Sequence, residues 1–182
     1  MNTTTAPGNG LPPAEEARLW TLLDRLTDPE IPVVTLREMG ILRALRRGVD
    51  GQVEVVITPT YSGCPAMDQI ADDITATLRA DGIGGRVVTQ LAPAWTTDWM
   101  TPEAREKLRA YGIAPPRCGA APEGESVIQF AAGGRPAARH AVACPQCGST
   151  NTTETSHFGS TACKALYRCL DCMEPFDYFK PI

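Results

Sequence analysis

Two pairs of cysteines near the C-terminal end form the most specific chemical pattern in the sequence. Cys144 and Cys147 make one C-x-x-C pair, and Cys169 and Cys172 make another. Four thiolates in this arrangement can surround one metal ion as a closed tetrahedron, and such a set favours zinc. We therefore predict one zinc ion per chain at these residues. Because the closed site leaves no position for a substrate, we expect the metal to be structural.

A further cysteine in the same region leaves a second kind of metal centre open. Cys163, Cys169 and Cys172 are spaced C-x5-C-x2-C, one residue away from the spacing of a plant-type iron–sulfur ferredoxin. In that ferredoxin the last ligand follows the other three, whereas here the remaining pair precedes them. We predict that Cys163 is an extra thiol near the metal. An iron–sulfur cluster, resident or transient, is the alternative to zinc.

A separate cysteine, Cys64, lies where a loop meets a helical pattern. Pro65 suits the first position of a helix, so Cys64 is expected at the N-cap, where the helix dipole and free amides stabilise a thiolate. Cys64 is then either a reactive thiol or transient iron ligand, or a half-buried residue at a loop end. Asp28 and Glu30, in a loop flanked by prolines, are either its polar partners or solvated acids in a segment that ends a helix.

The elements that would position these residues indicate an α+β fold. Apolar spacing and turn signals predict a small α-β-β-α-β-α domain followed by a C-terminal zinc ribbon. A capping box at 35–38 predicts one short helical turn after the first helix. The predicted segments are a disordered N-terminus (1–12), the α/β domain (13–112), a linker with one strand at 126–130 (113–142) and the ribbon (143–182). The predicted helices begin at Pro13, Pro65 and Thr101, and the predicted strands are 41–47, 52–58, 86–91, 154–158, 165–168 and 176–180.

Composition narrows the partners that we expect. The chain has 182 residues, of which 43% are hydrophobic, so one or two cores can form. Its net charge of −4 disfavours a nucleic acid as the main partner. No apolar run approaches the roughly 20 residues of a membrane span, and residues 1–10 lack the parts of a signal peptide. We therefore expect a cytoplasmic protein with no membrane partner, in which C-x-x-C pairs bind metal rather than form disulfides.

Several catalytic motifs are missing from the sequence. Only two histidines occur, and neither belongs to the Glu-x-x-His pattern that a carboxylate-bridged di-iron centre needs. There is no G-x-G-x-x-G, P-loop or G-x-S-x-G motif. We therefore predict that the chain has no catalytic constellation of its own and is not an enzyme.

The region from about residue 14 to 112 resembles the metal–sulfur cluster assembly family. The resemblance lies in D-P-E-I-P at 28–32, E-M-G-I at 38–41, T-P at 58–59 and G-C-P at 63–65. In the tail, F-G-S-T-A-C-K-A-L at 158–166 and C-M-E-P-F at 172–176 extend it. From about residue 14 the whole chain resembles the PaaD (also called PaaJ) subunit family of the bacterial phenylacetyl-CoA epoxidase system.

This resemblance implies an accessory role in aerobic phenylacetate catabolism. The partners would be the oxygenase and reductase subunits, whose di-iron or iron–sulfur centres this protein would help to assemble; a homo-oligomer is also open. Asp28, Glu30 and Cys64 match the acidic loop and exposed cysteine of the assembly family. Two alternatives remain: a zinc-ribbon adaptor that binds protein or nucleic acid, and a thiol–disulfide enzyme that uses Cys64.

Overall fold

The computed structural model describes residues 10–61, 63–117 and 141–182. The chain divides into two compact units, with the boundary between Trp95 and Thr96. The strand predicted at 126–130, and most of the predicted disordered N-terminus, lie outside the described residues. The predicted domain limits of 13–112 and 143–182 stay predictions.

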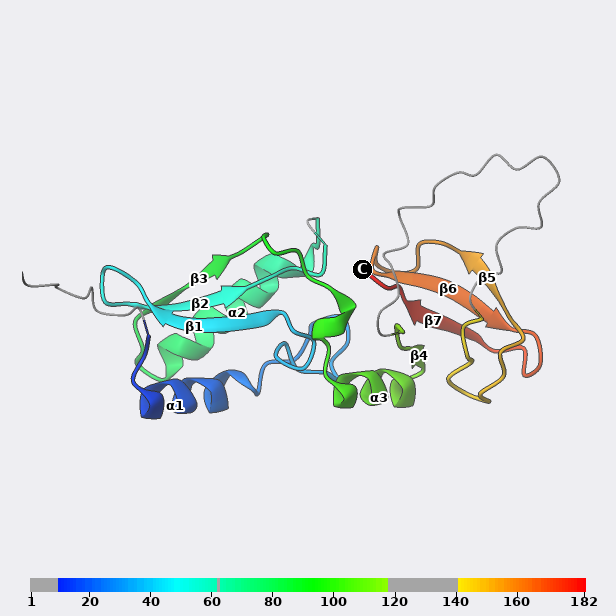
Figure 1. Cartoon of the computed structure of the whole chain (residues 1–182), viewed down its shortest axis with the longest axis horizontal. Helices are drawn as coiled ribbons and strands as arrows, with labels where there is room; N and C mark the ends of the chain where they lie inside the picture. Colours follow the sequence, from blue (N-terminus) through cyan, green and yellow to red (C-terminus); the bar gives the residue numbers. More distant parts are fainter. Residues whose placement is uncertain (1–9, 62, 118–140) are drawn as a thin grey trace, which may run out of the picture. The chain divides into compact units, whose positions relative to one another are not determined.

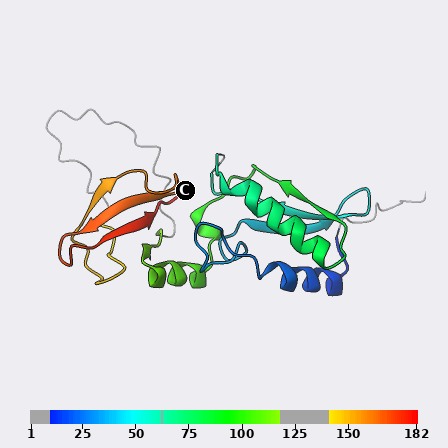
Figure 2. The ribbon, with the colours of Figure 1, turned by 180° about the vertical axis from the view of Figure 1, so that it is seen from behind.

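The first unit is a three-stranded sheet with two helices (Figure 1). Strand β2 is central; β1 pairs with it antiparallel and β3 pairs with it parallel. Figure 2 shows α2 lying across one face of this sheet. The predicted order of elements and the hairpin between the first two strands are confirmed. The elements are α1 (Pro13–Leu23), β1 (Leu42–Arg47), β2 (Val53–Ile57), α2 (Ala66–Ala80) and β3 (Gly85–Thr89).

Alternation along β2 determines which side chains face α2. Val53 pairs with Gly85, and a Cβ at Gly85 would lie 2.8 Å from Cδ1 of Leu78 on α2. Val53, Val55 and Ile57 therefore point toward the helix, since side chains alternate between the two faces of a strand. The core of this unit is apolar and includes Leu19, Leu23, Ile31, Val34, Leu36, Met39, Ile41, Leu45, Val53, Val55, Ile57, Ile70, Ile74, Leu78 and Trp95.

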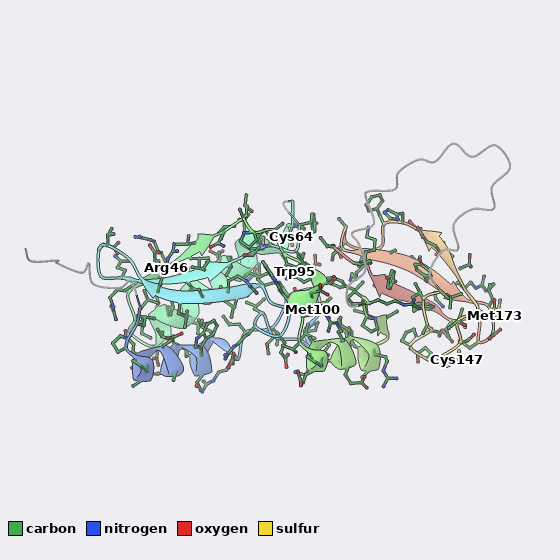
Figure 3. All side chains as sticks on the ribbon, in the orientation of Figure 1. Arg46, Cys64, Trp95, Met100, Cys147 and Met173 are labelled. Atoms are coloured by element: carbon green, nitrogen blue, oxygen red, sulfur yellow. The ribbon has the colours of Figure 1, made fainter. Side chains whose placement is uncertain are left out.

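The opposite face of the sheet carries a row of ion pairs. Glu54 accepts hydrogen bonds from Arg46, at 2.7 Å, and from Arg86. Arg86 also pairs with Asp50 at 2.6 Å, in the loop that joins β1 and β2. Arg46 is labelled on this face in Figure 3. These contacts connect all three strands, because one residue from each strand takes part.

The segment between α1 and β1 is a folded loop. Helix α1 ends at Leu23, earlier than the predicted stop just before Asp28. The predicted capping box is confirmed: the Thr35 N–H donates to Glu38 Oε2 at 2.9 Å, and the Glu38 N–H donates to Thr35 Oγ1 at 3.1 Å. The Met39 N–H donates to the Thr35 carbonyl and completes one helical turn. This loop carries the acidic residues predicted to lie near Cys64.

The second unit contains a four-stranded sheet in the order β4-β7-β6-β5. Thr101 caps α3 by accepting the Ala104 N–H at 3.1 Å, and Gly112 ends the helix with a φ of 95°. The predicted third helix therefore forms, but it belongs to this unit rather than to the first. The elements are a 3-10 turn (Thr97–Trp99), α3 (Pro102–Tyr111), β4 (Ile113–Ala114), β5 (Thr152–Ser156), β6 (Lys164–Cys169) and β7 (Pro175–Phe179).

The three ribbon strands predicted in the tail are present, each shifted by one or two residues. Beneath the sheet lies a small cluster of buried residues: Ala114, Val142, Cys144, Ala165, Cys169, Phe176 and Tyr178. Strand β4 was not predicted, although it pairs with β7 in parallel. In the described part of the chain, no helix combines the length and apolar character needed to cross a membrane.

Candidate metal centre and the Cys64 site

The four tail cysteines come together at one end of the ribbon. Their sulfur atoms all lie within 4.8 Å of one another. Cys144 and Cys169 are buried, whereas Cys147 and Cys172 are exposed. Figure 3 shows Cys147 at this end of the ribbon, close to Met173. The residues predicted from spacing alone therefore form one group in space.

The spacing of these sulfurs fits a zinc ion. A tetrahedron with Zn–S bonds of about 2.3 Å has sulfurs about 3.8 Å apart. Two of the distances are close to this value: Cys144 Sγ to Cys172 Sγ is 3.8 Å, and Cys147 Sγ to Cys169 Sγ is 3.6 Å. Each of these contacts joins one C-x-x-C pair to the other. The group can therefore accept the ion with little rearrangement.

The backbone of the second pair favours the thiolate that metal binding needs. The Cys172 N–H lies 3.5 Å from Cys169 Sγ, and this contact is the main cause that lowers the pKa of Cys169 to about 7. A lowered thiol pKa assists binding because metals bind the deprotonated sulfur. When bound, zinc would supply structural cross-linking between the two pairs.

The prediction that Cys163 lies near the metal differs from the structure. Cys163 precedes β6, and the metal ligand Cys169 ends the same strand. Six residues of extended chain span about 20 Å, so the two thiols lie at opposite ends of the strand. Cys163 is buried, and its sulfur lies 3.1 Å from Thr161 Oγ1. It does not belong to the four-cysteine group.

Cys64 lies one residue before the predicted position relative to its helix. The N-cap of α2 is Pro65, not Cys64. The Cys64 N–H donates to the Tyr61 carbonyl at 3.2 Å, so the loop turns back just before the helix. The thiol still receives the Ala66 N–H, which is one of the free amides of the first helical turn. It is partly exposed (Figure 3).

The charges around Cys64 have the opposite effect from the predicted one. Burial raises the pKa of the Cys64 thiol above its ordinary value, against the lowering effect of the Ala66 N–H. The carboxylates of Glu30 and Asp28 raise this pKa further, because they disfavour a second negative charge nearby. The prediction that the helix N-terminus stabilises a thiolate here is therefore wrong. The free thiol is protonated near neutral pH.

The structure brings Asp28 and Glu30 close enough to Cys64 to act on its charge. Asp28 is buried, and its Oδ1 accepts the N–H groups of Glu30 at 2.8 Å and Ile31 at 2.9 Å. This oxygen thereby orders the proline-flanked loop that presents Glu30. Asp28 consequently has a structural role as well as an electrostatic one.

Two threonines at the end of β2 were missed from the sequence. The Thr60 hydroxyl hydrogen-bonds to Cys64 and favours its thiolate form. Thr58 is 1% exposed, and its Oγ1 has no hydrogen-bond partner within the described part of the chain. Both follow a strand of β-branched residues, so their composition alone carries no signal of a site. Only the direction of the loop reveals Thr60 as a contact of the thiol.

Comparison with known proteins assigns both parts of the chain. Residues 16–90 match the model of an iron–sulfur cluster assembly protein, and residues 129–180 match the PaaD zinc beta ribbon domain. An Escherichia coli (strain K12) protein assigned to the 1,2-phenylacetyl-CoA epoxidase as one of its subunits is 47% identical over 174 residues, which cover 93% of this chain and 95% of that one. This chain belongs to the PaaD family.

Other similarities cover the N-terminal half of this PaaD family member. An Fe-S protein maturation auxiliary factor of Porphyromonas gingivalis (strain ATCC BAA-308 / W83) is 34% identical over 89 residues, 48% of this chain and 84% of that one. A crystal structure of a DUF59 domain of unknown function from Bacillus anthracis aligns with a TM-score of 0.48 and 24% identity. That alignment covers 52% of this chain and 92% of the other.

Proposed function

We propose that this PaaD family member is an accessory and maturation subunit of phenylacetyl-CoA epoxidase in aerobic phenylacetate catabolism. Family membership over almost the whole chain supports the accessory role, and the assembly model over residues 16–90 supports maturation. The protein would assist assembly of the iron–sulfur or di-iron centres of the reductase and oxygenase subunits. It would have no turnover of its own, and we expect it to work in the cytoplasm.

The observation that carries this proposal is the convergence of Cys64 with Glu30 and Asp28. Two carboxylates beside a thiol make a negatively charged group of ligands. Such a group is unfavourable for a free thiolate, but it favours an arriving cation, which neutralises the acids and displaces the thiol proton. The partial exposure of Cys64 allows exchange of iron or a cluster with another protein.

The ribbon would have a different part in the same function. Its four sulfurs complete a coordination shell, so the metal there is structural and is not passed on. A small folded module of this kind suits docking to another subunit. We propose that the ribbon binds a client while the first unit handles iron or a cluster.

The same charges argue against the two alternatives. A thiol–disulfide enzyme needs a lowered thiol pKa, whereas the pKa of Cys64 is raised. An adaptor for nucleic acid would use a basic surface, whereas the chain carries a net charge of −4.

The proposal is tested in cells that depend on this protein for growth on phenylacetate. Cys64→Ala and Cys64→Ser are expected to lower the iron and cluster content of the purified reductase or oxygenase, and to slow growth. Cys163→Ala is the matched control, because it removes another thiol that belongs to the ribbon unit. Normal client metal content in both Cys64 variants would reject the role of Cys64.

A further inference from the structure

The two cysteine loops of the ribbon are each ordered by their own backbone. In the first loop, the Gly148 N–H donates to the Cys144 carbonyl at 2.9 Å, and the Cys144 N–H donates to the Ser149 carbonyl at 2.8 Å. In the second loop, the Cys169 N–H donates to the Glu174 carbonyl at 3.0 Å. These bonds set the sulfur spacing within a pair. They do not set the distance between one pair and the other.

The β-ladder that connects the loops stops at the metal centre. Its last pair is Thr152 on β5 with Cys169 on β6. One further backbone bond follows, from the Leu170 N–H to the Asn151 carbonyl at 2.8 Å. Beyond this point, in the described structure, the hydrogen bonds that join the two loops come from side chains.

Asp171 makes those bonds from the middle of the second C-x-x-C pair. Its Oδ1 accepts the side-chain amide of Asn151 at 2.7 Å, and its Oδ2 accepts the hydroxyl of Ser149. Ser149 Oγ in turn accepts the Asn151 N–H at 3.0 Å. Both carboxylate oxygens thus bind the segment that follows the first cysteine pair.

We propose that Asp171 is a positioning residue of the metal centre, which fixes the two cysteine pairs at the spacing that the ion needs. Asp171 lies between two ligands of one pair and is bonded next to the other pair, so it controls the distance that the separate loops leave free. A site that is already at the right spacing loses less conformational freedom when the ion binds. Groups that orient metal ligands typically contribute about 10- to 100-fold in metal affinity.

Charge alone would oppose an aspartate at this place. Four thiolates around a divalent ion leave a net negative charge, and another anion beside them is electrostatically unfavourable. The two hydrogen bonds that Asp171 accepts offset this cost. Because these bonds are exposed to water, we expect an effect near the lower end of the range, about tenfold.

The test measures zinc affinity of the full chain by competition with a chromogenic chelator. Asp171→Ala is expected to weaken zinc binding about tenfold and to release zinc faster. Asp171→Asn retains one acceptor oxygen and is expected to lie between Asp171→Ala and the wild type. Asp177→Asn is the matched control: Asp177 pairs with Lys164 at 3.5 Å on the sheet, so this change weakens the ribbon without touching the two loops.

Two further measurements separate positioning from a general loss of stability. Asn151→Ala combined with Asp171→Ala is expected to cost less affinity than the sum of the single changes, because both remove the same bond. With saturating cobalt, all variants should give the spectrum of a four-sulfur site, since the ligands are unchanged. Zinc affinity of Asp171→Ala within twofold of the wild type, or an equal loss in Asp177→Asn, would overturn the proposal.

Discussion

At the scale of single residues, the electrostatics of Cys64 differ from those of an activated thiol. The first turn of α2 offers the Ala66 N–H, and Thr60 offers a hydroxyl, but burial and two carboxylates outweigh them. The site is therefore poor at keeping a bare thiolate. It is suited to a cation that would neutralise several negative groups at once.

Removing one of these carboxylates should lower the pKa of Cys64. Glu30→Gln is expected to lower it more than Asp28→Asn, because Glu30 has the larger effect. The raised folded pKa means that the protonated thiol favours the fold below its ordinary pKa of 9.0, and this contribution is lost as pH rises through the folded value. The measurement is the pH dependence of alkylation of the Cys64 peptide, followed by mass spectrometry.

Both substitutions leave the local structure largely intact. The amide oxygen introduced by Asp28→Asn can still accept the N–H groups of Glu30 and Ile31, so the loop keeps its turn. Asp72→Asn, at an exposed position of α2, is the control and should not change the profile. An unchanged profile in Glu30→Gln would show that the carboxylates do not act on the thiol.

The sequence predicts which residues approach Cys64 better than it predicts their effect. Asp28 and Glu30 stand out because two prolines constrain their loop, and the structure brings them to the thiol. The sign of the pKa shift could not be predicted, because the degree of burial depends on how the loop folds over the strand ends. Thr60 was missed for the same reason.

At the scale of elements, the sequence predicts those that have a strong period or a clear cap. The capping box at Thr35 and the cap at Thr101 are present with the expected hydrogen bonds. Strand β4, Ile113–Ala114, was missed because two residues show no alternation, and its pairing with β7 is set by distant residues. Cys163 was placed wrongly because spacing in sequence does not show that a whole strand separates it from Cys169.

Close packing between β3 and α2 gives a prediction at this scale. A Cβ at Gly85 would lie 2.9 Å from the Val53 carbonyl oxygen, and this backbone atom cannot move without distorting β2. Gly85→Ala is expected to lower the free energy of unfolding by about 1–3 kcal/mol. The neighbouring Gly84→Ala has nothing within 4 Å and should change it by at most about 0.5 kcal/mol. Chemical denaturation measures both, and equal effects would contradict the packing argument.

At the scale of the whole molecule, the two units gain stability from different sources. The first unit buries a large apolar core that includes residues from both helices and from the central strand. The buried cluster of the ribbon is small, and two of its seven members are the metal ligands Cys144 and Cys169. A small module of this kind depends on bound metal for much of its folding energy. We therefore expect the two units to respond differently when the metal is removed.

Zinc removal should unfold the ribbon and leave the first unit folded. The purified chain is expected to contain one zinc ion, and a chelator should expose the amides of β5, β6 and β7 to hydrogen exchange while β2 stays protected. Strand β4 should lose protection too, because it pairs with β7. The behaviour of α3 then tests the domain boundary. Exchange of α3 together with the ribbon supports the boundary between Trp95 and Thr96, whereas protection together with β2 supports the sequence-based limit at 112. Loss of protection in β2 in the same step would show that the units do not fold independently.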